Sequence, residues 1–158
     1  MLKKYEFTNE TKAVKDVLGN FHTLHRIKAL KDFGDVHKGD LGGWLEKESN
    51  LSQREDCWVY DDAQVYGNAQ VFGHARVFDN AQVFGTACVY NDAHVYGNVQ
   101  VFGRARVCDI AKVYDDAQVY GYAWVCDNAR VYGNAQVHGH ARVCDNSVVC
   151  DDTEILGD

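Results

Sequence analysis

The sequence predicts an all-β fold, a three-sided parallel β-helix with coils of 18 residues and a small N-terminal β cap. Three observations predict it. An aliphatic residue returns every six positions from Val59 to Ile155, which makes seventeen hexads without an insertion. A small residue stands two positions before nearly every aliphatic one, and a corner rich in Gly, Asn and Asp follows. Five glutamines recur at a period of 18: Gln64, Gln82, Gln100, Gln118 and Gln136.

Each hexad indicates one short strand followed by one turn. In the unit Ala-x-Val-aromatic, alternation places Ala and Val on one face of a strand and the x residue on the other. Gly, Asn and Asp tolerate the positive φ that a tight corner needs. A strand of four residues and a corner of two cannot form hairpins at this period, so we expect the strands to stack in parallel as a solenoid.

The x residue distinguishes three sides of the coil. The basic side carries Trp58, Arg76, His94, Lys112, Arg130 and Val148. The glutamine side carries the five glutamines and then Glu154. The third side carries Gln70, Cys88, Arg106, Trp124 and Arg142. Because a six-residue repeat alone does not produce these differences, the structural repeat is a coil of three hexads.

The hexads and the triangular coil resemble the left-handed β-helix of hexapeptide-repeat proteins. Two stretches outside the regular repeat, DFGDVHKGDLGGW (Asp32 to Trp44) and NLSQREDCWVYDDA (Asn50 to Ala63), are similar to the N-terminal signature of YdcK-type proteins. That bacterial and phage group is often labelled as acyltransferases. The resemblance implies a left-handed coil and, by analogy with the enzymes of the fold, a trimer that uses acyl-CoA. One departure is an aromatic residue after each aliphatic one, where hexapeptide acyltransferases have a small residue, so the resemblance supports the fold more than the activity.

The first part of the chain has no hexad, so we expect residues 1–50 to form the cap and residues 51–158 to form the β-helix. Alternation in Lys4–Phe7 and Phe21–Ile27 predicts two strands around a polar turn region at Asn9–Lys12. A solenoid needs a cap because its first coil otherwise exposes an apolar interior and an unpaired strand edge.

Stacking aligns the aromatic residues of successive coils into two ladders whose rings are expected to face outward. The basic-side ladder is Tyr60, Phe78, Tyr96, Tyr114 and Tyr132, and the glutamine-side ladder is Tyr66, Phe84, Phe102 and Tyr120. Rings in register stabilise parallel strands by cross-strand contact. Monomers rarely expose so much apolar surface, and the repeat runs to Ile155 without a second cap. We therefore expect a homo-oligomer or a protein partner to cover at least one face.

The third side offers a candidate binding patch. Trp124 lies one coil from both Arg106 and Arg142, close enough for each guanidinium group to stack on the indole. Tyr122 occupies a corner where the repeat does not require an aromatic residue. Arg, Trp and Tyr are the residue types that anchor interfaces. The candidate patch is Arg106, Tyr122, Trp124, Cys126 and Arg142, with ordinary surface packing as the alternative.

Cys108, Cys126 and Cys144 occupy one position in successive coils. Adjacent coils place Cα atoms within disulfide range, so two of the three could pair. The N-terminus lacks the apolar run of a signal peptide and no CxxC motif occurs. We therefore expect reduced thiols, no bound metal and a cytoplasmic location. No apolar stretch is long enough to predict a membrane span.

Aspartates line two corners of the coil. One corner carries Asp61, Asp62, Asp79, Asp115, Asp116, Asp151 and Asp152, and the other carries Asp92, Asp109, Asp127 and Asp145. Asp is a good turn residue, and we expect turn chemistry with partial neutralisation by Lys112 and Arg130. A cation site and a mimic of a phosphate row are the alternatives. The net charge of -7 argues against direct nucleic-acid binding.

Acyl transfer would require a histidine base, and the first candidates are His138 and His140, followed by His94. However, no loop interrupts a hexad to close over a substrate. We therefore favour a non-catalytic β-solenoid scaffold or binding and assembly module of bacterial or phage origin, without a cofactor. The alternatives are a trimeric CoA-dependent acyltransferase and a phage-encoded inhibitor or ligand sponge that uses the acidic corners or Trp124.

Overall fold

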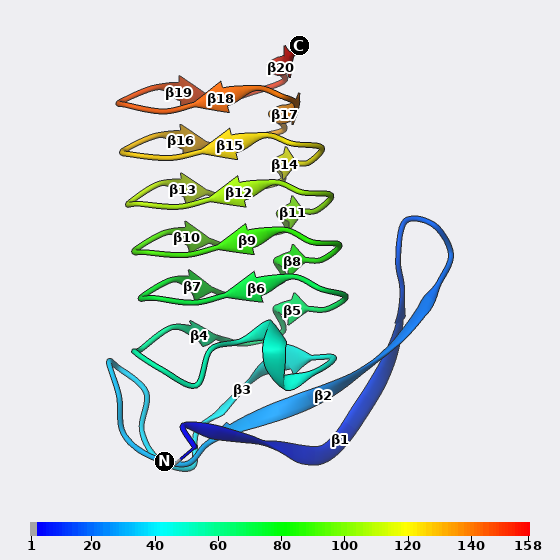
Figure 1. The fold of residues 1–158 in the computed structure, drawn as a ribbon, viewed down its shortest axis with the longest axis vertical. Coiled ribbons are helices and arrows are strands. Elements are labelled where there is room, and N and C mark those ends of the chain that lie inside the picture. Colours follow the sequence, from blue (N-terminus) through cyan, green and yellow to red (C-terminus); the bar gives the residue numbers. More distant parts are fainter. Residues whose placement is uncertain (1–2) are drawn as a thin grey trace.

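The computed structural model describes residues 3–158, and its coils stack along one axis (Figure 1). The N-terminal segment holds β1 (Tyr5–Lys15), β2 (Phe21–Ala29), β3 (Leu41–Leu45) and the 3-10 helix η1 (Glu48–Asn50). The basic side holds β4 (Trp58–Val59), β7 (Arg76–Val77), β10 (His94–Val95), β13 (Lys112–Val113), β16 (Arg130–Val131) and β19 (Val148–Val149). The glutamine side holds β5 (Gln64–Val65), β8 (Gln82–Val83), β11 (Gln100–Val101), β14 (Gln118–Val119), β17 (Gln136–Gly139) and β20 (Glu154–Gly157). The third side holds β6 (Gln70–Val71), β9 (Cys88–Val89), β12 (Arg106–Val107), β15 (Trp124–Val125) and β18 (Arg142–Val143).

The pairing register confirms the predicted β-solenoid with 18-residue coils. Each solenoid strand pairs in parallel with the strand one coil away, so that Gln100 lies opposite Gln118 and Arg106 lies opposite Trp124. The strands form three separate sheets, one for each side. The left-handed sense of the coil stays a prediction from the resemblance. No helix in residues 3–158 has the length and apolar character that a membrane crossing requires.

The alanines and valines of the repeat form one continuous interior. Ala111 and Val113, near the middle of the solenoid, are fully buried, as are their equivalents in the coils on either side. Each of these side chains contacts its counterparts in adjacent coils, because every coil supplies the same two inward positions. The core of the regular coils is therefore a narrow column of small side chains, and larger residues, among them Trp58, enter it only at the N-terminal end.

The N-terminal segment joins the solenoid through β3. β1, β2 and β3 pair antiparallel, whereas β3 runs parallel to β5, with Trp44 opposite Gln64. This segment also closes the first coil, because Tyr5 and Ile27 are fully buried in the same core as the solenoid residues. A Cβ on Gly43 would lie only 2.5 Å from the carbonyl oxygen of Ala63 in the first coil, so this close packing requires glycine. The division of the chain at residue 50 stays a prediction.

The turn of the N-terminal hairpin lies elsewhere than predicted. Asn9–Lys12, expected as the turn, belong to β1, where a register shift between Phe7 and Thr11 accommodates extra residues as a bulge. The turn lies at Asp16–Asn20, where the Asp16 carboxylate accepts two backbone N–H bonds at 2.9 Å. The polar residues fit a strand because this stretch of β1 is largely exposed to solvent.

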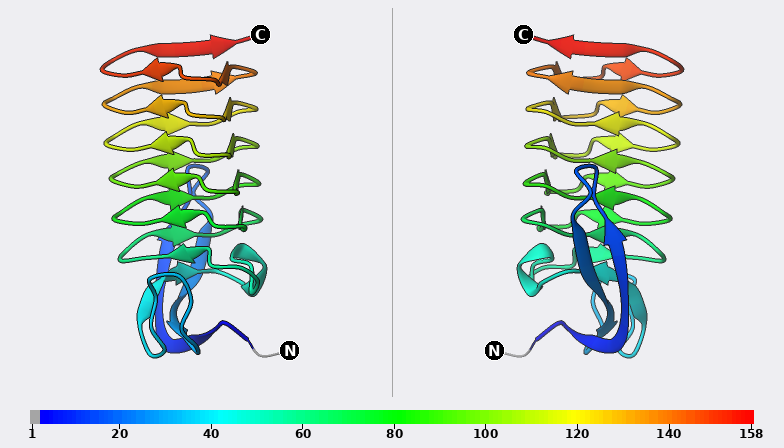
Figure 2. Two further views of the ribbon diagram at one scale, coloured as in Figure 1. Left: turned by 90° about the vertical axis from the view of Figure 1, so that its left-hand side faces the viewer. Right: turned by 90° about the vertical axis from the view of Figure 1, so that its right-hand side faces the viewer.

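The β1–β2 hairpin extends beside the glutamine side of the solenoid (Figure 2). Leu24 of β2 and Trp44 of β3 pack against Tyr66 and Phe84, which are only 2% and 4% exposed. The prediction that all nine ladder rings face outward is therefore wrong for these two rings. The chain covers them with its own hairpin, and burial raises the pKa of Tyr66 to about 12.

Candidate functional site

The third side holds a stack of alternating cationic and aromatic side chains. Arg106, Trp124 and Arg142 pair in register across β12, β15 and β18. The guanidinium carbon of Arg142 lies 4.4 Å from the Trp124 ring centroid, and that of Arg106 lies 5.7 Å from it. Both distances fall within the range of cation–π attraction. The structure therefore brings together three of the five residues named for the patch in one column.

A second column lies at the corner before these strands and widens the patch. Tyr122 stacks on His140 with ring centroids 4.7 Å apart, and the Arg104 guanidinium lies 5.6 Å from the Tyr122 ring. Tyr122 is 53% exposed. The patch predicted from the sequence included Tyr122 but neither Arg104 nor His140. Their spacing of one coil from Tyr122 was the signal that could have found them.

The arginines of this patch have no acidic partner in the described part of the chain. The ion pairs within residues 3–158 involve other cations, and none includes Arg104, Arg106 or Arg142. All three arginines are exposed. Their positive charges therefore face solvent without a carboxylate to neutralise them.

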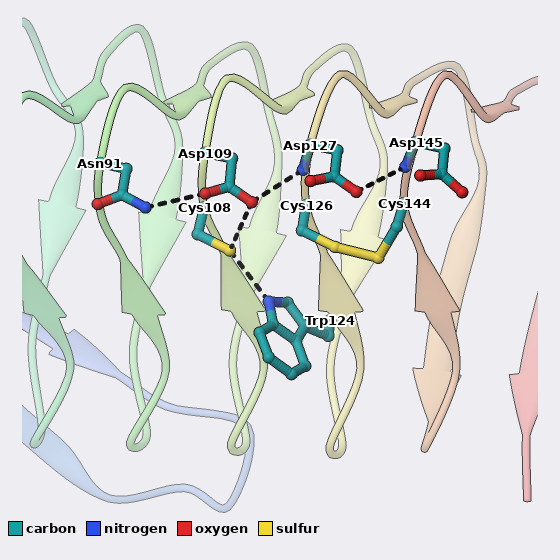
Figure 3. Close-up of a disulfide and its surroundings, with 8 residues drawn as sticks. All are labelled: Asn91, Cys108, Asp109, Trp124, Cys126, Asp127, Cys144 and Asp145. Atoms are coloured by element: carbon teal, nitrogen blue, oxygen red, sulfur yellow. Dashed lines mark hydrogen bonds between the residues drawn. A yellow bond between two sulfur atoms is a disulfide. The ribbon is translucent and has the colours of Figure 1, made fainter.

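The cysteines in and beside the patch depart from the expectation of reduced thiols. Cys126 and Cys144 form a disulfide, with Cα atoms 4.7 Å apart in successive coils (Figure 3). The expectation was wrong for this pair because the in-register stack places equivalent side chains of adjacent coils within bonding reach. Cys108 is a free, buried thiol, and the Trp124 Nε1–H donates to its sulfur at 3.0 Å. That hydrogen bond fixes the plane on which the arginines stack. The other free thiols are Cys57, Cys88 and Cys150.

The aspartates at the corner of the third side serve as turn residues. Asp109, Asp127 and Asp145 have positive φ values of 58°, 56° and 60°. The Asp109 carboxylate accepts the backbone N–H of Asp127 at 3.1 Å, and Asp127 does the same for Asp145 at 3.0 Å (Figure 3). The carboxylates thus link successive coils. Lys112 and Arg130, expected to neutralise these carboxylates in part, form no direct ion pair with them within residues 3–158.

The aromatic ladders are stacked along most of their length. Ring centroids of successive coils lie 4.6 to 5.0 Å apart, except that Tyr60 meets Phe78 edge-on at 6.1 Å. His138 extends the glutamine-side ladder and lies 4.7 Å from Tyr120. The ladder rings that remain half-buried are Tyr60, Phe78, Tyr96, Tyr114, Tyr132, Phe102 and Tyr120.

The three histidines considered for acyl transfer lie apart from one another. His94 belongs to the basic side, His138 to the glutamine side, and His140 to the corner before the third side. The Nε2 atom of His138 lies 2.7 Å from Oε1 of Glu154, so a carboxylate orients this imidazole. Burial and the two flanking cations lower the pKa of His94. No hydrogen bond or ring stacking within residues 3–158 joins any two of these imidazoles.

The tip of the hairpin creates a hollow that no feature of the sequence predicted. Its volume is about 360 Å³, and Leu18 of the turn and Phe84 of the ladder are among the residues that line it. His22 also lines the hollow. Its Nε2 atom lies 2.9 Å from Oδ2 of Asp16, and its Nδ1 atom lies 3.0 Å from Oε2 of Glu46. No periodic signal marks this site, because it depends on where the hairpin lies against the coils.

Comparison with known proteins agrees with this architecture. The family model described as the YdcK β-solenoid repeat matches residues 69–85 and 123–139. A curated relative from Escherichia coli strain K12, named "Uncharacterized acetyltransferase YdcK", is 36% identical over 63 residues. The match covers 38% of this chain and 19% of the relative, so it spans a small part of that protein. The stacked 18-residue coils show that the chain is a β-solenoid, and these matches show that segments of it are similar to the YdcK β-solenoid repeat.

Proposed function

We propose that this chain is a non-catalytic binding or assembly module that engages a protein partner through the Arg106, Trp124 and Arg142 stack. The observation that carries the proposal is that two guanidinium groups are held on one indole while no carboxylate of residues 3–158 forms an ion pair with either. Arg and Trp dominate the energetics of protein interfaces. A partner carboxylate can accept two parallel hydrogen bonds from one guanidinium.

The partner that we favour is a second copy of this chain. The sequence has 23 acidic and 16 basic residues, and its aspartates repeat along two corners. An acidic corner of a second copy is therefore complementary in charge to the arginines of the patch. The half-buried rings of the ladders supply apolar area that an assembly would cover.

Native mass spectrometry of the purified chain tests this proposal, because it reports subunit number and any retained small molecule together. The wild-type chain is expected to give a multimer, and Trp124→Ala and Arg142→Ala are expected to shift it toward the monomer. Gln70→Ala is the matched control, since Gln70 holds the equivalent position of the same sheet near its other end. A monomeric wild-type chain, or an unchanged mass in the patch variants, would contradict assembly through the patch.

A second candidate function is acyl transfer, and the contact between His138 and Glu154 favours it. A histidine oriented by a carboxylate is suited to act as a general base, and the relative from Escherichia coli carries acetyltransferase in its name. Thiol release from acetyl-CoA should then be lost in His138→Ala and retained in His94→Ala. Absence of turnover by the wild-type chain over a broad set of acceptors would exclude this function.

A further inference from the structure

The basic side carries a column of cations with too few counter-charges. Arg76, His94, Lys112 and Arg130 lie opposite one another in register across β7, β10, β13 and β16. Arg76 lies 3.5 Å from Asp35, whereas Lys112 and Arg130 have no ion pair within residues 3–158. Like charges directly opposite on neighbouring strands destabilise a sheet. The described chain therefore holds a repulsive arrangement that a bound anion would relieve.

The fold does not require cations at this position of the coil. The equivalent position on the glutamine side is Gln in five coils, and those strands pair in the same parallel register. A neutral side chain is thus compatible with the geometry. The positive charges need an explanation other than the stability of the coil.

The same cations line a hollow. His94, Lys112 and Arg130 border a space of about 660 Å³, together with Asn128 and Asn146 from the preceding corner. Ammonium and guanidinium groups donate charge-assisted hydrogen bonds to anions, and the asparagine amides supply further N–H donors. The hollow combines concentrated positive charge with space for a ligand of small-molecule size.

His94 reports on this charge environment. Burial lowers its pKa first, followed by the neighbouring charges of Arg76 and Lys112, while Asp92 acts in the opposite direction. Asp92 also lines the hollow and is its one carboxylate. An anion bound between the cations would favour the charged imidazole and raise the pKa of His94.

We propose that the hollow over β10, β13 and β16 binds an oligophosphate, a short chain of linked phosphate groups. Linked phosphates carry negative charge continuously along their length, so they can meet each cation of a column whose steps are about 4.8 Å. Lysine binds phosphate as a point charge, and arginine does so with a planar fork of donors. Inorganic triphosphate and nucleoside triphosphates both carry this chemistry. The site lies on a different side from the patch and does not depend on the proposed assembly.

Isothermal titration calorimetry of the full chain with sodium triphosphate at low ionic strength tests the proposal. The wild-type chain is expected to bind one triphosphate, and Lys112→Gln/Arg130→Gln should weaken binding at least tenfold. Lys28→Gln/Lys31→Gln is the matched control, because it removes two exposed charges from the N-terminal segment and should change the affinity less than twofold. No binding by the wild-type chain, or equal losses in the two double variants, would overturn the proposal.

Two further titrations define the ligand class. Citrate tests whether any trivalent anion suffices, and binding as tight as that of triphosphate would overturn the assignment to phosphate. A nucleoside triphosphate distinguishes the source: tighter binding than inorganic triphosphate supports an organic oligophosphate, and equal binding supports recognition of the phosphate chain alone.

Two readouts other than affinity distinguish loss of the binding site from loss of the fold. Triphosphate should raise the melting temperature of the wild-type chain but not that of Lys112→Gln/Arg130→Gln, which should be at least as stable as the wild type without ligand. In nuclear magnetic resonance titrations, triphosphate should raise the pKa of His94. An unchanged His94 titration in saturated protein would contradict binding in this hollow.

Discussion

The two halves of the solenoid are held by different means. In the early coils, the β1–β2 hairpin covers Tyr66 and Phe84 and adds packing from outside the repeat. In the late coils, the disulfide between Cys126 and Cys144 joins two coils covalently. Coils of a solenoid contact only their neighbours. Nearly identical repeats therefore gain different local stability from contacts that lie outside the repeat.

The sharpest test of this comparison uses two phenylalanines in adjacent coils of one ladder. Phe84 is 4% exposed within the buried cluster beneath the hairpin, whereas Phe102 is half-buried and packs against the margin of that cluster. We expect Phe84→Ala to lower the free energy of unfolding by about 3 kcal/mol and Phe102→Ala by about 1.5 kcal/mol. Urea denaturation measures both. Equal losses would show that the hairpin contributes no more than ring stacking does.

Removing the disulfide between Cys126 and Cys144 tests how the late coils are stabilised. Cys126→Ala leaves Cys108 and Cys144 two coils apart, beyond bonding reach, so no replacement disulfide forms. We expect a loss of about 2–3 kcal/mol, because the bond closes a loop across 18 residues of sequence. Hydrogen exchange should accelerate in the late coils and stay unchanged under the hairpin.

The free thiol Cys150 supplies the control for that variant. Cys150→Ala should leave stability within about 0.5 kcal/mol, as expected for a substitution at a partly exposed position. Wild-type protein in reductant should reproduce the Cys126→Ala loss. If reductant has no effect, the disulfide does not stabilise the late coils.

The stability of the docked β1–β2 hairpin should depend on pH, whereas that of the late coils should not. Hydrogen bonding to Asp16 raises the pKa of His22 above its ordinary 6.5, and the same contact lowers the pKa of Asp16 to about 2. The His22 contribution is therefore complete below pH 6.5 and is lost as the pH rises through the raised pKa. The Asp16 contribution is present above pH 3.8 and is lost as the pH falls toward 2.

We therefore expect β1 and β2 to be most protected between pH 3.8 and 6.5. Hydrogen exchange at pH 5.5 and 8.5, corrected for intrinsic rates, should show faster opening of the hairpin at the higher pH. His22→Gln should remove this difference without affecting the late coils. Identical protection in the wild type at both values would contradict the role of His22.

The smallest effect is expected in the exposed stack of the late coils. Arg142→Ala should cost about 0.5–1 kcal/mol, since the guanidinium lies over Trp124 at an exposed site. Trp44 and Trp58 are buried, so the change in tryptophan emission reports mainly on Trp124. Arg142→Lys should retain part of the interaction. An unchanged emission in Arg142→Ala would show that the two side chains do not interact in solution.

Part of the candidate site could be predicted from the sequence. Because the register is 18 residues, reading the chain at that period placed Arg106, Trp124 and Arg142 in one column, and the structure shows them there. The same reading placed three cysteines in one column but could not choose between them. Cys126 bonds to Cys144, while Cys108 accepts the indole N–H. That choice depends on side-chain positions, which periodicity does not specify.

The solenoid, its three sides and its buried Ala and Val column follow from the amino-acid sequence alone, because each coil repeats the same short-range contacts. The position of the N-terminal hairpin, the ladder rings that it buries and the contacts of His22 with Asp16 and Glu46 emerge only in the folded chain. These contacts join segments that share no period. Their geometry follows from packing between distant parts of the chain, and no local pattern encodes it.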